Sequence, residues 1–428
     1  MNLAPPIARL RPPVARTPAR PRGTLQRERH QPDYTILVAV IALSAMGILM
    51  VYSSSAMQGY VARDDTFATV GPQIQWAVLG LVAMVLMMRV DYRYLRLASV
   101  PFFVVALALL VVVLLPPTGP LQPKVVGGSA RWLQVGPLPA VHPAEVAKLA
   151  LVVYLAHWFA KRGRSIRGLT SGTIPFLVII APVLALVFKE PDLGTTTVLA
   201  LTAFAMFFVA GANVVHLGAM FSAAALAGLV AGLEGYQVSR IRTWLDPWSD
   251  RLGEGFHTVQ GLLALGLGGI LGTGLGNSRI FVPNAFNDFI FAVIGQEFGL
   301  LGGGLVIVLF LVLAYAGIRT ALAAPDTFGA LLAAGITAWL CLQAFINIGV
   351  VVALLPITGI TLPFISAGGS SLIISFAAVG ILLSISRETV EKGTWNDDAT
   401  ADRGGRHGRA YLPGTGRRPL VARPARRS

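Results

Sequence analysis

The chain has 428 residues, of which 55% are hydrophobic and 13% are charged, and its mean hydropathy is +0.69. Soluble domains carry charge on about 25% of their residues, so this composition excludes an ordinary soluble protein and predicts a membrane protein with several spans. The formal net charge of +14 comes largely from the two arginine-rich ends of the chain. The single cysteine, Cys341, lies in an apolar stretch, which excludes a disulfide framework and a Cys-x-x-Cys metal motif.

The first and last segments, residues 1–33 and 387–428, are rich in Pro, Arg and Gly. Such segments cannot bury a core, so we expect disordered basic tails. Basic segments beside a membrane typically contact anionic lipid of the inner leaflet, which favours membrane lipid over nucleic acid as their partner. A cleavable signal peptide is not predicted, because the first apolar segment starts only at residue 34 and is long enough to span.

Between the tails, apolar stretches able to cross about 30 Å of hydrocarbon recur along the chain. We predict an all-α transmembrane domain over residues 34–386, with about ten helices and a large polar loop between the seventh and the eighth. The predicted spans are 34–52, 74–88, 99–115, 143–159, 174–188, 195–211, 215–233, 289–316, 327–352 and 363–386.

The distribution of Lys and Arg predicts the orientation, because basic loops stay on the cytoplasmic side. With the N-terminal tail inside, the even-numbered connections are also inside, and they hold basic groups such as Arg93 and Lys161. Both termini are then cytoplasmic and the loop over residues 234–288 is external. An anionic substrate would explain the basic residues that remain in external loops, which are Lys124, Arg131, Arg240, Arg242 and Arg251.

The first polar motif runs from Gly128 to Pro137 and resumes over His142–Lys148. Trp132 beside a polar loop is either an interfacial anchor or a substrate contact. Glu145 and Lys148 are three residues apart near a helix start, so they share a face and can pair. That pair either joins two helices or belongs to a substrate site. In both cases it faces protein, because a charge turned to lipid costs about 2.5 kcal/mol or more.

The second motif is the turn Lys189–Thr195 between the fifth and sixth predicted helices. Asp192 stands where a helix cap is expected. Lys189 is not explained by the turn, and a cation at this depth can bind phosphate. We therefore group Lys189 with Arg131 and Lys148 as a predicted anion site.

The third motif lies in the long external loop and contains Arg240, Arg242 and two tryptophans, followed by the glycine-rich run Gly272–Asn277. It indicates either a surface-lying amphipathic segment or substrate contacts. Nucleotide binding is excluded, since no strand precedes the glycines and no Gly-Lys-Ser/Thr follows them. The loop ends at Asp288, a carboxylate standing where a water-exposed loop re-enters an apolar helix.

The fourth motif, Leu355–Ser371, contains a Gly-Gly-Ser-Ser run within an apolar helix. Such residues either permit close helix packing or bring backbone amides near a ligand. The candidate contacts are Ser366, Gly368, Gly369, Ser370 and Ser371.

Taken in order, the four motifs resemble those of the SEDS family, the shape, elongation, division and sporulation proteins that include FtsW and RodA. Its members carry R-W-I-x-L-G-P with Q-P-S-E-x-A-K, then P-D-x-G-T, L-P-E-x-x-T-D-F-I-F-A and L-P-F-x-S-x-G-G-S-S. The chain departs from the pattern at His142, Asn284, Phe286, Asn287 and Ala367, where the family has Gln, Glu, His, Thr and Tyr. Met50–Ser55 and Thr361–Phe364 are closer to FtsW, whereas Thr358-Gly359 is typical of RodA-like members.

The resemblance implies an inverting peptidoglycan glycosyltransferase that polymerises lipid II outside the cytoplasmic membrane, beside a class B penicillin-binding protein and other cell-division proteins. Asp288 matches the family's essential acidic residue and is the expected general base. The remaining matches imply substrate contacts at Arg131, Trp132, Glu145, Lys148 and Asp192. No cofactor is evident, although a divalent cation could share the charge of the pyrophosphate.

Three alternatives stay open at this point. Charged residues inside helices also mark transport paths, so a lipid II flippase is the main competitor, although the broken-helix inverted repeats of many transporters are not seen. A RodA-like elongation polymerase is the second. A structural scaffold for division proteins, the third, is compatible with catalysis.

Overall fold

The computed structural model describes residues 31–116, 121–126, 129–135, 140–231, 236–283 and 285–388. Almost all of the two basic tails lies outside these ranges, so their disorder stays a prediction. Gly128, Pro137 and Asn284 of the polar motifs also lie outside the described residues.

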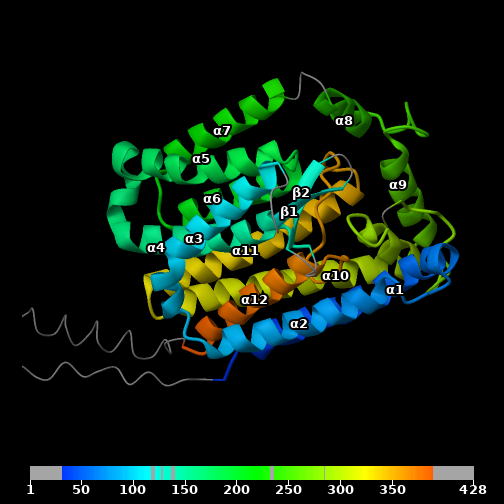
Figure 1. Cartoon of the computed structure of the whole chain (residues 1–428), viewed down its shortest axis with the longest axis horizontal. Coiled ribbons are helices and arrows are strands. Elements are labelled where there is room, and N and C mark those ends of the chain that lie inside the picture. Colours follow the sequence, from blue (N-terminus) through cyan, green and yellow to red (C-terminus); the bar gives the residue numbers. More distant parts are fainter. Residues whose placement is uncertain are drawn as a thin grey trace, which may run out of the picture.

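The predicted all-α class is confirmed, because α-helices make up nearly all of the regular structure (Figure 1). The helices are α1 (Tyr34–Arg63), α2 (Val70–Arg89), α3 (Arg93–Leu114), α4 (Pro143–Arg162), α5 (Ile174–Lys189), α6 (Leu193–Val209), α7 (Val214–Ala231), α8 (Tyr236–Leu245), α9 (Phe256–Gly268), α10 (Ile290–Ala323), α11 (Thr327–Val351) and α12 (Gly369–Ser386). Short helical turns at Gly163–Arg167 and Leu169–Thr173 join α4 to α5.

Seven helices of the described residues are long and apolar enough to cross a membrane: α1, α2, α3, α5 with its preceding turn, α10, α11 and α12. The other three predicted spans are also helical. They correspond to α4, which carries charged residues, to the 17-residue α6 and to α7. The protein is therefore a multi-pass membrane protein, and the order of its helices follows the order of the predicted spans.

Two connections contain more structure than the sequence indicated. The segment between α3 and α4 forms an antiparallel hairpin of β1 (Leu121–Val126) and β2 (Ser129–Val135), in which Lys124 lies opposite Trp132. Valine and tryptophan favour extended backbone, and this short run has no helical period. The long polar loop contains α8 and α9, so much of it is helical.

The axes of the long helices lie roughly parallel or antiparallel to one another, and the two ends of the described chain meet at one end of the molecule (Figure 1). There the backbone N–H of Asp33 donates to Ser386 Oγ over 3.1 Å, and Arg93 pairs with Glu388 over 2.8 Å. The hairpin, α8 and α9 lie toward the opposite end. Within the bundle, α2 packs along α12, α1 along α10, and α11 contacts α4, α6 and α10.

Helix α10 is interrupted at Gly299, and the glycine-rich loop that follows α9 forms hydrogen bonds with the backbone there. Gly299 has φ of 63°, which glycine adopts without steric cost. The carbonyls of Gln296 and Glu297 accept from the N–H groups of Thr273 and Gly274, over 2.9 and 3.0 Å. The glycine-rich run of the third motif therefore satisfies the backbone of α10 at its break. Ser53 of α1 and Ser278 donate to the carboxylate of Glu297.

Candidate active site

Asp288 lies in the turn that leads into α10, and neighbouring elements hold the backbone of this turn in place. Asn347 of α11 donates its side-chain amide to the carbonyl oxygens of Asp288 and Ile360, both over 2.7 Å. The hydroxyl of Ser366 donates to the carbonyl of Asn287 over 2.6 Å. These bonds come from α11 and the segment before α12, so the position of Asp288 is set by two other parts of the chain.

The surroundings of Asp288 favour its uncharged form more than water would. Burial raises the pKa of this carboxyl from 3.8 to about 6, although a backbone hydrogen bond partly opposes the shift. A carboxylate with a pKa near 6 is still mostly ionised at pH 7, and it accepts a proton more readily than an ordinary aspartate. These are the properties of a general base.

Asp288 lines a cavity of about 390 Å³ that we call the cationic cavity after Arg131 and Lys148, although Glu145 and Asp192 also line it. The first, second and fourth polar motifs contribute to its wall together with Asn287 and Asp288 at the end of the long loop, although these segments are far apart in the sequence. Of the predicted site residues it contains Asp288, Arg131, Trp132, Glu145, Lys148, Asp192, Gly368, Ser370 and Ser371. The motifs are brought together because α4, α6, α10 and α12 all begin at this end of the bundle.

Lys148 is 2% exposed, and its ammonium group is fully engaged. It lies 2.8 Å from a carboxylate oxygen of Glu145, which confirms the predicted pair, and donates to Gln343 over 2.7 Å. It also lies over the ring of Trp339. The charge of Lys148 is therefore already balanced by Glu145, and a ligand would have to share it.

Within the described residues, in contrast, the guanidinium of Arg131 bonds only neutral oxygens. It donates to the backbone carbonyls of Glu190 and Pro191, over 2.9 and 2.7 Å. Burial, and next the charge of Asp192, raises the pKa of the Glu190 carboxyl to about 8, so this neighbour is mainly uncharged at pH 7. The positive charge of Arg131 thus remains available to an anion in the cavity.

Asp192 caps α6, as predicted. Its carboxylate accepts from the backbone N–H and the hydroxyl of Thr195, over 2.9 and 2.8 Å. It also lines the cavity, so the structural role and a role toward a ligand are compatible.

Trp132 does not stand free at an interface, since its ring meets that of His142 edge-on at 5.2 Å. His142 itself lines the cavity and is buried, and desolvation lowers its pKa, so its imidazole is neutral. His142 was noted in the sequence only as a departure from the family pattern. The structure adds it to the residues that face a ligand.

Five predicted site residues are not found in the described wall of this cavity. Lys189 was grouped with Arg131 and Lys148, but its side chain is exposed. The inward stripe of α5 contains Val183 and Val187, and a residue two positions beyond Val187 points to the other side of the helix. Lys189 is therefore not part of the cluster.

Of the other four, Ser366 is buried and donates to the turn of Asp288, so it supports the site from behind. Gly369 faces α2, where an added Cβ would meet the ring of Trp76 at 2.4 Å. Gly369 therefore fits the first interpretation of the fourth motif, in which small residues permit close helix packing. Arg242 is exposed on α8, and Arg240 is in the same helix with its side chain outside the described residues.

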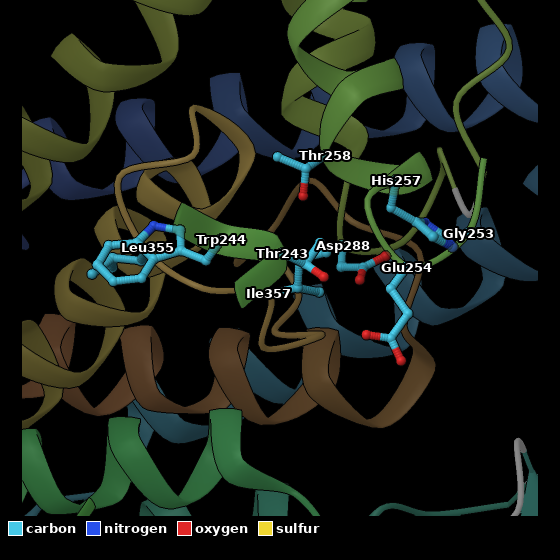
Figure 2. Close-up of a pocket in the computed structure, with 9 residues that line it drawn as sticks. All are labelled: Thr243, Trp244, Gly253, Glu254, His257, Thr258, Asp288, Leu355 and Ile357. Atoms are coloured by element: carbon cyan, nitrogen blue, oxygen red, sulfur yellow. The ribbon is translucent and has the colours of Figure 1, made fainter. Parts of the chain in front are cut away.

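A second cavity, of about 260 Å³, is also lined by Asp288 (Figure 2). We call it the α8–α9 cavity, since Thr243, Trp244, Gly253, Glu254, His257 and Thr258 form its wall with Asp288, Leu355 and Ile357. The sequence analysis noted Trp244 as one of the two tryptophans of the third motif, but apart from Asp288 it named none of these residues as a site residue. Within the described part of the chain, no group of three or more His, Cys, Asp or Glu residues is arranged to hold a metal ion.

Comparison with known proteins agrees with this arrangement of motifs. The family model of the FtsW/RodA/SpoVE cell cycle proteins matches residues 34–391. The chain belongs to this family. It is 40% identical over 366 residues to stage V sporulation protein E of Bacillus subtilis, covering 84% of this chain and 98% of the relative. It is also 39% identical over 373 residues to a protein of Geobacter metallireducens named as a probable peptidoglycan glycosyltransferase FtsW, covering 86% and 97%.

Two solved structures have folds similar to that of this chain. A chain of a peptidoglycan synthase complex, described as coordinating polymerization and crosslinking, aligns with a TM-score of 0.69 at 28% identity, covering 83% of this chain and 98% of that one. RodA of Thermus thermophilus aligns with a TM-score of 0.61 at 26% identity, covering 84% and 98%.

The sequence contains a pattern that indicates two of the side-chain amides supporting the site. Gln343 and Asn347 are four residues apart in an otherwise apolar helix, so they share one face. Polar side chains in such a helix bond across helix contacts or line a cavity. Here Gln343 bonds Lys148 and the carbonyl of Thr361, and Asn347 bonds the backbone of Asp288.

Proposed function

We propose that the protein is an inverting peptidoglycan glycosyltransferase that polymerises lipid II, with Asp288 as its general base. One observation carries the proposal: a carboxylate of raised pKa and the cation Arg131 line the same cavity at one end of a transmembrane bundle. The relatives named as peptidoglycan glycosyltransferases and the similar synthase complex support the same reaction.

The chemistry requires these two kinds of group. The 4-hydroxyl of the acceptor sugar attacks C1 of the donor's N-acetylmuramic acid while Asp288 takes the hydroxyl proton. A new C1–O4 bond forms, and the bond from C1 to the pyrophosphate oxygen breaks. The undecaprenyl pyrophosphate leaves with the electron pair, so positive charge near it stabilises the transition state.

Arg131 is the first candidate to bind the departing pyrophosphate, because its bonds to backbone carbonyls orient the guanidinium without neutralising it. Lys148 is the second, since Glu145 already balances its charge. Trp132, His142, Ser370 and Ser371 complete the wall of this cavity and would contact the rest of the donor.

The proposed setting follows from the arginine distribution and from the relatives. We place the reaction at the outer face of the bacterial cytoplasmic membrane, with both termini in the cytoplasm. The similarity to the chain of a synthase complex supports a class B penicillin-binding protein as partner, and the similarity to FtsW supports a role in division. A flippase is less well supported, because both cavities lie at one end of the bundle instead of forming a path across it.

The test is polymerisation of lipid II by purified protein, alone and with its transpeptidase, scored as glycan chains. Asp288→Asn keeps the size of the side chain but cannot accept a proton, so the rate should fall roughly 10²- to 10⁴-fold. Asp65→Asn, at an exposed aspartate of the α1–α2 connection, is the matched control and should polymerise normally. Membrane insertion and transpeptidase binding should be unchanged in both variants. Near-normal glycan synthesis by Asp288→Asn would refute the assignment.

A further inference from the structure

Asp288 borders both the cationic cavity and the α8–α9 cavity, although the two share no other described residue. Asp288 thus belongs to the walls of two cavities whose lining residues differ in chemical character. In Figure 2 the carboxyl group of Asp288 lies between Thr243 and Trp244 on one side and His257 and Glu254 on the other. A group that binds in the α8–α9 cavity would therefore meet the proposed base directly.

The charges of the two walls differ in a way that distinguishes two substrates. Arg131 and Lys148 line the cationic cavity together with the carboxyl groups of Glu145, Asp192 and Asp288, whereas the described wall of the α8–α9 cavity contains the carboxyl groups of Glu254 and Asp288 and neither Lys nor Arg. A departing pyrophosphate would be repelled by Glu254 and attracted by Arg131. The α8–α9 cavity is suited instead to a neutral polar group, such as a sugar with free hydroxyls.

Trp244 supplies the flat apolar surface of this cavity, and its orientation is fixed. Its indole N–H donates to the backbone carbonyl of Ala353 over 3.0 Å, and its side chain is half-buried. An interfacial anchor would instead direct its N–H toward the lipid head groups. Trp248, four residues later, does not line the cavity, and it is 52% exposed.

The remaining wall provides hydrogen-bonding groups around Asp288. Thr243 and Thr258 carry hydroxyls, and His257 packs its ring against Phe289, the residue after Asp288, with centroids 5.8 Å apart. Burial lowers the pKa of His257, so its neutral imidazole can both donate and accept. An aromatic face with a few oriented polar groups is the usual composition of a small-ligand site.

We propose that the α8–α9 cavity binds the acceptor disaccharide, with Trp244 as the platform against which one of its sugar rings stacks. This inference rests on the proposed glycosyltransferase function and extends it to the second substrate. It makes Trp244 a determinant of acceptor affinity. The donor, whose pyrophosphate lies in the cationic cavity, does not contact Trp244.

The experiment separates the two substrates. A lipid II analogue whose terminal sugar lacks the 4-hydroxyl can act only as a donor, and one whose pyrophosphate is replaced by a group that cannot leave can act only as an acceptor. Transfer from the first analogue to the second allows the two KM values to be measured separately. Trp244→Ala and Trp244→Leu should raise the KM for the acceptor about tenfold and leave that for the donor within about twofold. Trp244→Phe keeps an aromatic face and should recover most of the affinity. Trp248→Ala is the matched control and should behave like the parent protein.

The outcomes distinguish the inference from the function on which it rests. If the unsubstituted protein makes no glycan, the glycosyltransferase proposal fails and the acceptor assignment fails with it. If that protein is active but Trp244→Leu changes both KM values equally, or only that of the donor, the acceptor assignment alone is overturned. An unchanged acceptor KM in Trp244→Leu also overturns it. The Leu and Phe variants keep an apolar side chain, so they decide the matter even if the Ala variant does not fold.

Discussion

The proton affinity of Asp288 predicts how the reaction depends on pH. Its pKa of about 6 means that the reactive carboxylate is lost as the pH falls through 6, so the rate should drop about tenfold for each further unit. Because folding raises this pKa above its usual value, protonation of Asp288 stabilises the folded protein. The loss of activity should therefore be reversible and precede acid unfolding.

The measurement is the initial rate of lipid II polymerisation between pH 5 and 8. His257 lines the α8–α9 cavity with Asp288, so His257→Gln serves as the control and should keep the acid limb near pH 6. An acid limb near pH 4, or one that disappears in His257→Gln, would show that Asp288 is not the group whose ionisation limits the rate.

At the level of single residues, the sequence identified groups that combine an unusual polarity with an apolar setting. Asp288, Arg131 and Lys148 were found in this way. Trp244 and His257 were noted only as parts of the third motif and not as site residues, because their proposed role depends on a cavity formed by helices that the sequence presented as one polar loop. Lys189 was misassigned because the sequence shows only that it is near the other motif residues along the chain. It is two positions beyond the inward-facing Val187, so it lies on another face of the helix.

Helix α4 depends on the ion pair between Glu145 and Lys148, which are 7% and 2% exposed. Lys148→Met should destabilise the protein by about 3–5 kcal/mol, since it leaves a buried carboxylate without its partner. The double variant Glu145→Gln/Lys148→Met removes both charges and should recover most of this loss. Thermal unfolding in detergent measures these differences.

Lys189→Met is the matched control for this element, since its ammonium is exposed and its replacement should leave the melting temperature nearly unchanged. Melting of Lys148→Met at the temperature of the parent protein would mean that the pair contributes little to folding. In that case Lys148 would be available to a ligand after all.

Elements marked by long apolar stretches were predicted from the sequence, and elements formed by tertiary contacts were not. The order of the transmembrane helices followed from apolar stretches alone. The hairpin of β1 and β2 is short and is completed by a bridge between Leu133 and Val141, which a local pattern does not reveal. Helix α9 is apolar but only 13 residues long, so it did not meet the length expected of a span.

For the molecule as a whole, the arginine distribution predicts which end faces the cytoplasm. In a variant with Cys341 replaced by Ala, Ser249→Cys should react with an impermeant thiol reagent added outside intact cells, because Ser249 is exposed in the long loop. Ser165→Cys, exposed in the connection between α4 and α5, should react only after the membrane is opened. The reverse pattern would invert the orientation and put both cavities on the cytoplasmic side.

The pairing of early with late helices constrains how the protein is assembled during synthesis. The contact between Asp33 and Ser386 joins residues 353 positions apart, and that between Ser53 and Glu297 joins residues 244 apart. Helices α1 and α2 therefore enter the bilayer long before α10 and α12, against which they pack, have been made. Until then their inward faces must be covered by lipid or by an insertion chaperone. A ribosome that stops before α12 thus leaves α2 without its main neighbour, so truncated chains should be recognised by membrane proteases even when every earlier helix has been inserted correctly.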